Sequence, residues 1–230
     1  MGTRYVLLWL EAPLQSWGAD SKFGRRDTLP FPTRSGILGV ILCAMGRSGE
    51  QKELLKRFAD LPQTVYSYIL KKREPLLLDF QMVGSGYDDR DPWETLLIPK
   101  TSEGKKAVGG GTKMTYRYYL QDARFGVVME LPADLAAEVS AALKNPEFDI
   151  YLGRKNCVPT DFVWRGEFGT YEEAENELKR IAESKGVKLE FTVLDGDHPE
   201  LGDAMTLNDV PIQFGTIKQY RSRRITVKTA

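Results

Sequence analysis

The chain has 230 residues, of which 42% are hydrophobic, and its 32 Lys and Arg balance its 32 Asp and Glu. A chain of this length buries most of its unfolded surface, so we expect one large domain, or one and a half, with a real core. Its two Cys and single His exclude a disulfide framework and a zinc site with four His or Cys ligands. We therefore expect no metal and no cofactor.

No stretch of the sequence is long enough and apolar enough to span a membrane. The longest apolar run, Gly36 to Gly46, is well short of the ~20 residues that a membrane-spanning helix needs. Tyr5 to Leu10 is too short for the core of a signal peptide. We therefore expect a cytoplasmic protein without a membrane partner.

The N-terminal part of the chain predicts a strand followed by two helices. Arg4 to Glu11 is a short apolar run typical of a buried strand, and a long polar loop follows it. Thr33 or Ser35 can cap the next helix, whose residues up to Met45 are apolar on all sides, as a helix buried in the core requires. A second, amphipathic helix is predicted around Leu54 to Phe58.

Strand patterns dominate the middle of the chain. Thr64 to Leu70 and Leu76 to Val83 are predicted to pair as a hairpin, because only five residues separate them. Gly84 to Thr112 has no periodicity and is too long for an ordinary connection, so we expect an inserted element with a function of its own.

Two further strands and a helix complete a first unit. Met114 to Leu120 and Phe125 to Leu131 resume the strand pattern, and Pro132 opens a helix. This order of elements is compatible with an α+β domain of the ferredoxin-like (RRM-like) class that carries an inserted hairpin. We expect this domain to span residues 1–150, including the insertion at residues 84–112.

A smaller C-terminal region is predicted for residues 151–230. Thr170 and Glu173 form a capping box at the start of an amphipathic helix, which Gly186 ends. Val187 to Leu194 and the segments up to Lys228 have the pattern of strands. We expect this region to complete the sheet or to pack on it.

The zero net charge hides a segregation of basic and acidic residues along the chain. Acidic residues collect in two stretches, residues 167–177 and 195–209. The pattern indicates either one basic face that binds an anionic partner or an ordinary surface of solvated charges. The basic residues form three groups: Arg25, Arg26 and Arg34; Lys100, Lys105, Lys106, Lys113, Arg117 and Arg124; and Lys218, Arg221, Arg223, Arg224 and Lys228.

The sequence offers little for catalysis. The single histidine, His198, lies in an acidic, turn-rich loop and is either a solvated loop residue or a general base. Asp88 to Asp91 lacks the pattern of a calcium-binding loop, and Gly109 to Lys113 lacks that of a phosphate-binding loop. We expect a solvated loop tip and a flexible hinge at these two places.

Binding of a nucleic acid has better support. The start of the predicted buried helix places Thr33, Arg34 and Ser35 beside free backbone N–H groups, where they either cap the helix or bind a phosphate. Gln15 and Trp17 follow the first strand, and the Trp17 ring is either part of the core or a platform for an unstacked base.

Two more segments place cations beside aromatic residues or a glycine. In the run Met114 to Leu120 the side chains alternate, so Arg117 and Tyr119 share one face of the strand. A basic, aromatic face of a sheet is how RRM-like domains hold single-stranded RNA. Arg154 and Lys155 follow Gly153 in what is either an ordinary polar turn or a place where the backbone comes close to a phosphate.

Four segments together resemble a known family. In order and spacing they are similar to the Cas5-type subunits of subtype I-E CRISPR Cascade complexes, which belong to the RAMP superfamily, and the resemblance covers about residues 5–165. It implies a ferredoxin-like fold with a protruding hairpin thumb, which residues 84–112 would supply. The segments are Pro13 to Gly18, Phe31 to Val40, Tyr119 to Phe125 and Tyr151 to Cys157.

The resemblance also implies a function. Subunits of this type hold the 5′ repeat-derived handle of the CRISPR RNA next to the backbone subunit CasC and the large subunit CasA, and they meet target DNA through the assembled complex. They are not the nuclease of that subtype, so we expect an RNA-binding subunit in antiviral defence without enzymatic activity. The residues expected to bind RNA are Gln15, Trp17, Arg25, Arg26, Thr33, Arg34, Ser35, Lys105, Lys106, Lys113, Arg117, Arg124, Arg154 and Lys155.

Two other functions stay open on the sequence alone. One is a metal-independent endoribonuclease that processes CRISPR repeat RNA, as in the related subtype I-C. It would need an acid and a base at a 2′-hydroxyl, and the only candidates are Tyr116, Lys113 and His198. The other is a scaffold that binds proteins and has no affinity for RNA.

Overall fold

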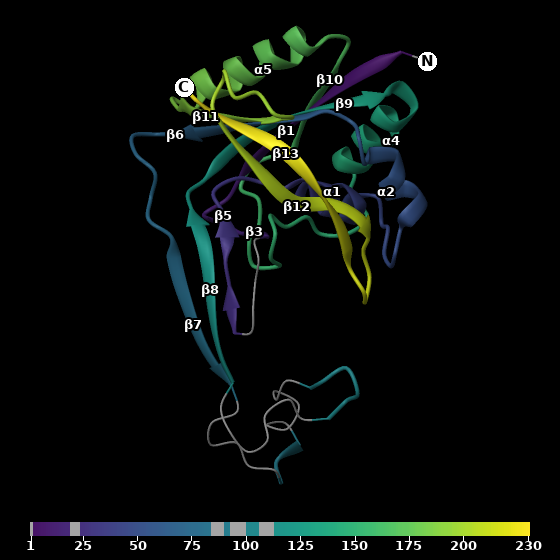
Figure 1. Ribbon diagram of the computed structural model, residues 1–230, viewed down its shortest axis with the longest axis vertical. Helices are drawn as coiled ribbons and strands as arrows, with labels where there is room; N and C mark the ends of the chain where they lie inside the picture. The colour runs from purple at the N-terminus through teal and green to yellow at the C-terminus, as the bar shows by residue number, and fades with distance from the viewer. Residues whose placement is uncertain (1, 19–23, 84–89, 93–99, 106–112) are drawn as a thin grey trace.

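The centre of the molecule is a sheet of seven antiparallel strands (Figure 1). The computed structural model describes residues 2–18, 24–83, 90–92, 100–105 and 113–230. The sheet order is β10-β1-β9-β6-β11-β13-β12, and the predicted α+β class is confirmed. The strands are β1 (Thr3–Glu11), β6 (Gln63–Ile69), β9 (Arg124–Pro132), β10 (Trp164–Phe168), β11 (Lys188–Asp195), β12 (Asp203–Gln213) and β13 (Gln219–Thr229).

Helices cover both faces of this sheet. The helices of the described ranges are α1 (Arg34–Ala44), α2 (Lys52–Phe58), α4 (Ala133–Lys144) and α5 (Tyr171–Ser184). Successive side chains of β1 point to opposite faces, so Val6 and Leu8 join the core that contains α1 and α4, whereas Leu7 and Trp9 join the core under α5. None of these helices is long and apolar enough to cross a membrane.

The starts of α1 and α5 form as the sequence predicts. Thr33 is the N-cap of α1, and its Oγ1 accepts a hydrogen bond from the N–H of Gly36 at 3.1 Å. At the start of α5, Thr170 and Glu173 form the predicted capping box. Gly186 follows the end of α5 with a φ of +64°, a left-handed conformation that stops a helix.

The predicted hairpin of residues 64–70 and 76–83 is wrong. Both runs are strands, but β6 pairs with β9 and β11, whereas β7 (Leu77–Val83) pairs with β8 (Lys113–Gln121). β8 and β9 also lie in different sheets, although only a turn at Asp122 separates them. An apolar pattern identifies a strand but leaves its partner open, because the partner depends on which faces become buried in the whole fold.

β7 and β8 form a ribbon that extends away from the main sheet (Figure 1). β8 also pairs with β2 (Leu14–Gln15) and, in parallel, with β4 (Arg25–Arg26), while β3 (Trp17–Gly18) pairs with β5 (Thr28–Leu29). Residues 84–112, the predicted thumb, connect the two ribbon strands and lie mostly outside the described residues. The form of this insertion therefore stays a prediction.

The C-terminal strands continue the same sheet as the N-terminal ones. β11 pairs with β6 on one side and with β13 on the other, and β12 forms the edge. The β12–β13 hairpin lies beside the start of α1, which brings residues about 175 positions apart in sequence into hydrogen-bonding contact. The predicted division of the chain at residue 150 stays a prediction.

Two glycines of α1 allow a matched test of this packing. A Cβ on Gly36 would lie 2.7 Å from the buried Trp17 ring, whereas a Cβ on Gly39 would meet nothing within 4 Å. We expect Gly36→Ala to lower the free energy of unfolding by about 1–3 kcal/mol through overpacking. Gly39→Ala should instead raise it by about 0.5–1 kcal/mol, since Ala is the better helix former. Urea denaturation measures both, and equal effects would contradict the described contact between α1 and Trp17.

Candidate nucleic-acid interface

Gln15 and Trp17 are part of the core, and Trp17 also borders the central cavity described below. Both side chains are 0% exposed. The Gln15 amide donates to the backbone oxygens of Leu10 and Ala123, and its Oε1 accepts a hydrogen bond from the Trp17 indole N–H at 3.1 Å. The prediction that these two residues contact a base is corrected, because an enclosed ring offers no face for stacking. Their place beside the first strand was predicted, and the structure decides for the core alternative.

The start of α1 already holds an anion from the protein itself. The backbone N–H of Arg34 donates to Oδ2 of Asp209 at 2.8 Å, so a carboxylate sits where the sequence predicts a phosphate. The Arg34 side chain is turned inward, where it binds Asp195 and the backbone oxygen of Ala59. Arg34 is 4% exposed, and the prediction that it binds RNA is corrected for this reason.

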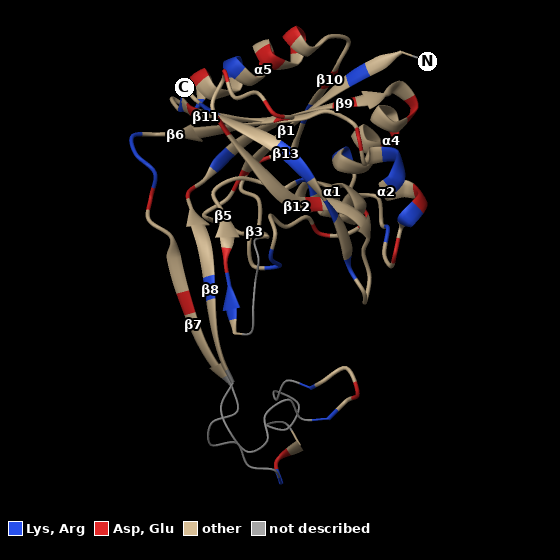
Figure 2. Ribbon diagram, viewed as in Figure 1, with Lys and Arg blue, Asp and Glu red and all other residues tan. Residues whose placement is uncertain are grey.

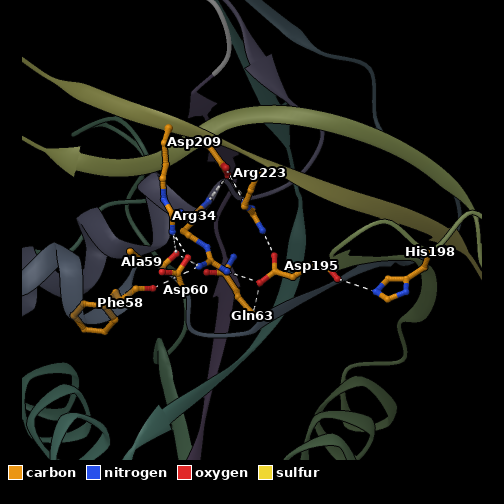
Figure 3. A network of polar contacts seen from close by, with 10 residues as sticks. Arg34, Phe58, Ala59, Asp60, Gln63, Asp195, His198, Asp209 and Arg223 are labelled. Atoms are coloured by element: carbon orange, nitrogen blue, oxygen red, sulfur yellow. Dashed lines mark hydrogen bonds and ion pairs between the residues drawn. The ribbon is translucent and has the colours of Figure 1, made fainter.

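Arg34 belongs to a buried polar network that joins the C-terminal strands to the helices (Figure 3). Arg223 of β13 binds Asp209 through Nε and Nη2, at 2.8 and 2.9 Å, and binds Asp195 through Nη1. Asp195 also accepts the backbone N–H of Gln63 at 3.0 Å. Two arginines and two aspartates thus compensate one another, as buried charges must.

The two arginines of the network respond differently to their surroundings. Burial lowers the pKa of the Arg34 guanidinium, and attraction to Asp195 offsets only part of that effect. Burial also opposes the charged form of Arg223, but its hydrogen bonds to Asp209 and its attraction to Asp195 outweigh the loss of solvation and raise its pKa.

Most of the basic tail is neutralised in the same way. Figure 2 marks the basic positions along β13, and the ion pairs of its three arginines mean that the tail does not form the free basic face that its composition indicates. Lys218 and Lys228 are exceptions, since both are exposed and make no ion pair with the described residues. The pairs are Arg221 with Asp60, Arg223 with Asp195 and Asp209, and Arg224 with Asp197.

Three of the predicted cations do come together, at the root of the ribbon. Arg117, Arg154 and Lys155 line one open cavity of about 520 Å³, with Gln81 and Asn156 beside them. We call it the ribbon cavity. No Asp or Glu is among its lining residues in the described part of the chain.

Arg154 keeps its charge unpaired while being held in place. Its Nη1 donates to the backbone oxygen of Tyr118 at 3.0 Å, and its Nη2 donates to that of Arg26 at 2.9 Å. The guanidinium carbon lies 4.5 Å from the centre of the Tyr119 ring. Because its partners are carbonyl groups and a ring, the positive charge remains available to a phosphate.

The turn that carries Arg154 and Lys155 is fixed by a close backbone contact. Gly153 has a φ of +97°, and a Cβ there would lie 1.6 Å from the backbone oxygen of Ser16. The N–H of Ser16 donates to the backbone oxygen of Leu152 at 3.1 Å. Gly153, where the sequence predicts the close approach of a phosphate, is therefore approached by the backbone of Ser16 instead. This contact fixes the position of the two cations that follow the glycine.

The ribbon cavity is one of three cavities that are linked by shared lining residues. A central cavity of about 380 Å³ shares Tyr151 and Gly153 with it, and a hairpin cavity of about 410 Å³ shares Gly18, Ser35 and Tyr220 with the central one. We call these three cavities together the groove. Thr33 and Ser35 line it from α1, and Lys218 lines it from the β12–β13 hairpin.

The groove includes residues that the motifs did not single out. Tyr151 and Tyr220 lie at the two places where its cavities join, and Asn208 lines the hairpin cavity. Tyr151 lies in the segment Tyr151 to Cys157, but the sequence predicts RNA contacts there only for Arg154 and Lys155. Tyr220 lies in a tail whose signal is dominated by charge, so nothing local distinguishes it from a core tyrosine.

The other predicted RNA contacts lie outside the groove or outside the described residues. Arg124 pairs with Glu11 at 3.1 Å and does not line any of the three cavities, and its expected contact with RNA stays a prediction. Arg25 and Arg26 are exposed on β4 beside β8, and Arg25 binds Asp27 at 2.9 Å. Lys105 is exposed and pairs with Glu103 at 3.1 Å. Lys106 and the side chain of Lys113 are not described, and for Arg25, Arg26 and Lys105 the expected contact stays a prediction.

The candidate acids and bases do not form a site in the described residues. His198 lies in the β11–β12 loop, where its Nε2 is 3.0 Å from the backbone oxygen of Asp195. Tyr116 lies on the ribbon with its ring 5.1 Å from that of Phe80. The described residues also contain no cluster of three groups suited to hold a metal ion.

Comparison with known proteins identifies the family of this chain. Residues 5–227 match the family described as CRISPR-associated protein (Cas_Cas5). The chain belongs to the Cas5 family. The resemblance that the four sequence segments indicate is thereby confirmed.

Individual Cas5 relatives agree with this assignment. The chain is 30% identical over 165 residues, 70% of each protein, to the CRISPR system Cascade subunit CasD of Escherichia coli (strain K12). It superposes with a TM-score of 0.73 and 30% identity on a solved chain described as a CRISPR RNA-guided surveillance complex, covering 98% of this chain and 90% of that one. A structure described as a Cas protein shares the fold, with a TM-score of 0.55, 23% identity and coverage of 98% and 94%.

Neighbouring arginines on β13 test the buried network. Arg223→Ala should lower the free energy of unfolding by about 2–3 kcal/mol, because it leaves the buried Asp209 and the half-buried Asp195 with one cation fewer. Arg224→Ala removes an exposed pair with Asp197 and an exposed hydrogen bond to Thr206, and it should cost about 1 kcal/mol or less. Chemical denaturation of the two variants gives the comparison. Similar losses would mean that the network does not support the fold.

Proposed function

We propose that this Cas5 protein is a CRISPR RNA-binding subunit of a type I-E Cascade surveillance complex and that it holds the 5′ repeat-derived handle of the RNA in the groove. Its similarity to a Cascade subunit and to a chain of an RNA-guided surveillance complex supports the assembly. The observation that carries the RNA contact is a groove whose ribbon and central cavities are lined by four cations and, among the described residues, by no acid. The cations are Arg117, Arg154, Lys155 and Lys218.

The chemistry of the groove suits an unpaired strand. Cations and hydroxyl groups position a phosphate backbone but do not read its sequence. Bases can be read only where the strand is unpaired, by stacking on aromatic rings and by hydrogen bonds to base edges. Thr33 and Ser35 line the central part of the groove, so they stay in the proposed contact set although Arg34 leaves it.

The assignment of the fold to the ferredoxin-like class belongs to the same proposal. Four strands of the main sheet and two of its helices occur along the chain in the order β1, α1, β6, β9, α4 and β10, with the ribbon and other short elements between them. In the sheet, the strands take the order β10-β1-β9-β6. A β-α-β-β-α-β succession of this kind is that of the ferredoxin-like class, which the RAMP superfamily uses. In this reading the β7–β8 ribbon carries the thumb, and the C-terminal strands β11, β12 and β13 extend the sheet.

The remaining expectations follow from the family. We propose CasC and CasA as neighbours in the complex, target DNA as a partner of the assembled particle, and the cytoplasm as the compartment. The protein is proposed to act without catalysis and without a cofactor. No contact among the described residues favours the endoribonuclease alternative, since His198 lies in the β11–β12 loop, Tyr116 lies on the ribbon, and neither lines any of the three cavities.

The salt dependence of RNA binding tests the proposal. An RNA with the repeat-derived handle should bind the purified protein with a slope of log K against log salt near −3, because about four phosphates contribute ~0.7 each. Lys155→Ala should reduce the slope by about 0.7 and weaken binding to any sequence alike. An affinity that does not change with salt would contradict the groove.

Lys179 provides the matched control for that experiment. It is exposed like Lys155, but it lies on α5, which covers the opposite face of the sheet, and it pairs with Glu175 at 2.8 Å. Lys179→Ala removes the same charge at a distance from the groove, so slope and affinity should stay at the wild-type values. An equal effect of both variants would mean that the net charge of the protein, and not the groove, attracts the RNA.

A further inference from the structure

The β12–β13 hairpin presents one face to the buried network and the other to the groove. Successive side chains of a strand alternate between faces. On β13, Arg221 and Arg223 bind Asp60 and Asp209 on the helix side, whereas Tyr220 and Ser222 line the hairpin cavity. The ion pairs therefore anchor the strand from one side and leave the other side free to line the groove.

A bulge in β12 places two adjacent polar residues beside the hairpin cavity. Leu207 pairs with Arg223 and Val210 pairs with Arg221, so Asn208 and Asp209 together oppose a single residue of β13. Asp209 is 5% exposed and binds Arg34 and Arg223. Asn208 is exposed and lines the hairpin cavity. Asp209 also lines this cavity, but its carboxylate is bound by Arg34 and Arg223, so the Asn208 amide is the polar group that remains available there.

Tyr220 is an aromatic side chain without a partner in the described residues. It is half-buried, lines both the hairpin and central cavities, and makes no hydrogen bond or ring contact there. Burial raises the pKa of its phenol, so the hydroxyl stays neutral and able to donate. Trp17, by contrast, has both a hydrogen-bond partner and complete burial.

We propose that the hairpin cavity is a pocket for one unpaired base of the RNA, in which Tyr220 is the stacking platform and Asn208 reads the base edge. This inference rests on the proposed function, and it gives the C-terminal hairpin a part in RNA recognition. An aromatic ring supplies stacking to any base, whereas an amide offers both a donor and an acceptor and can distinguish among bases. The unpaired cations of the neighbouring cavities match the charge of the strand that carries such a base.

Three substitutions of Tyr220 test the stacking. The probe is handle RNA with 2-aminopurine at successive positions, whose fluorescence falls when the base stacks. Wild-type protein and Tyr220→Phe should quench one position and bind with similar affinity. Tyr220→Leu keeps an apolar side chain without a ring, so it should lose the quenching and bind about fivefold or more weakly, as should Tyr220→Ala.

The outcomes separate this inference from the proposed function. Tyr220 carries no charge, so none of its variants should change the salt slope. Wild-type protein with the expected slope, but with Tyr220→Leu equal to Tyr220→Phe in affinity and quenching, would overturn the stacking role and leave the groove standing. Wild-type protein without a salt slope would overturn both. A melting temperature close to wild type for Tyr220→Leu excludes loss of the fold as the cause.

Asn208→Ala tests the reading of the base edge. The variant should bind an RNA with permuted handle sequence as well as wild type does, because stacking and phosphate contacts do not depend on sequence. Its preference for the true handle over the permuted RNA should shrink about fivefold or more. An unchanged preference would contradict the assignment of Asn208.

Discussion

The buried network of Arg34, Arg223, Asp195 and Asp209 is the interaction on which the candidate site depends. Buried charges are stable only when they are paired with good geometry, so the four groups fix one another's positions. They come from α1, β11, β12 and β13, and Asp195 also holds the first residue of β6. The network therefore sets the distance between the start of α1 and the β12–β13 hairpin, which are two walls of the groove.

The same network explains why binding groups lie on one side of the hairpin. Asp209 occupies the positive end of α1, so a phosphate is not needed there and the helix start contributes hydroxyl groups instead. On the opposite wall, carbonyl groups hold Arg154 without neutralising it. The aspartates of the network thus pair with the arginines that support the fold, and the cations of the groove remain available to an anionic strand.

The sequence predicts local structure well and contacts over long distances poorly. The Thr33 cap and the Thr170–Glu173 capping box form as predicted, because their signals lie within a few residues of one another. Arg34 and Trp17 lie in segments that resemble the family, yet only the fold shows that one meets aspartates about 160 to 175 residues away and that the other is enclosed. Arg154 and Lys155 were predictable as a cationic turn, whereas Tyr220 has no local signal.

Photo-crosslinking of the RNA to the protein tests the central claim most directly. Handle RNA with 4-thiouridine at single positions is bound, irradiated and digested, and the linked peptides are identified by mass spectrometry. The account predicts crosslinks in two segments far apart in sequence, Tyr151 to Asn156 and Lys218 to Ser222, because both line one groove. Crosslinks confined to α5, or absent from both segments, would contradict it.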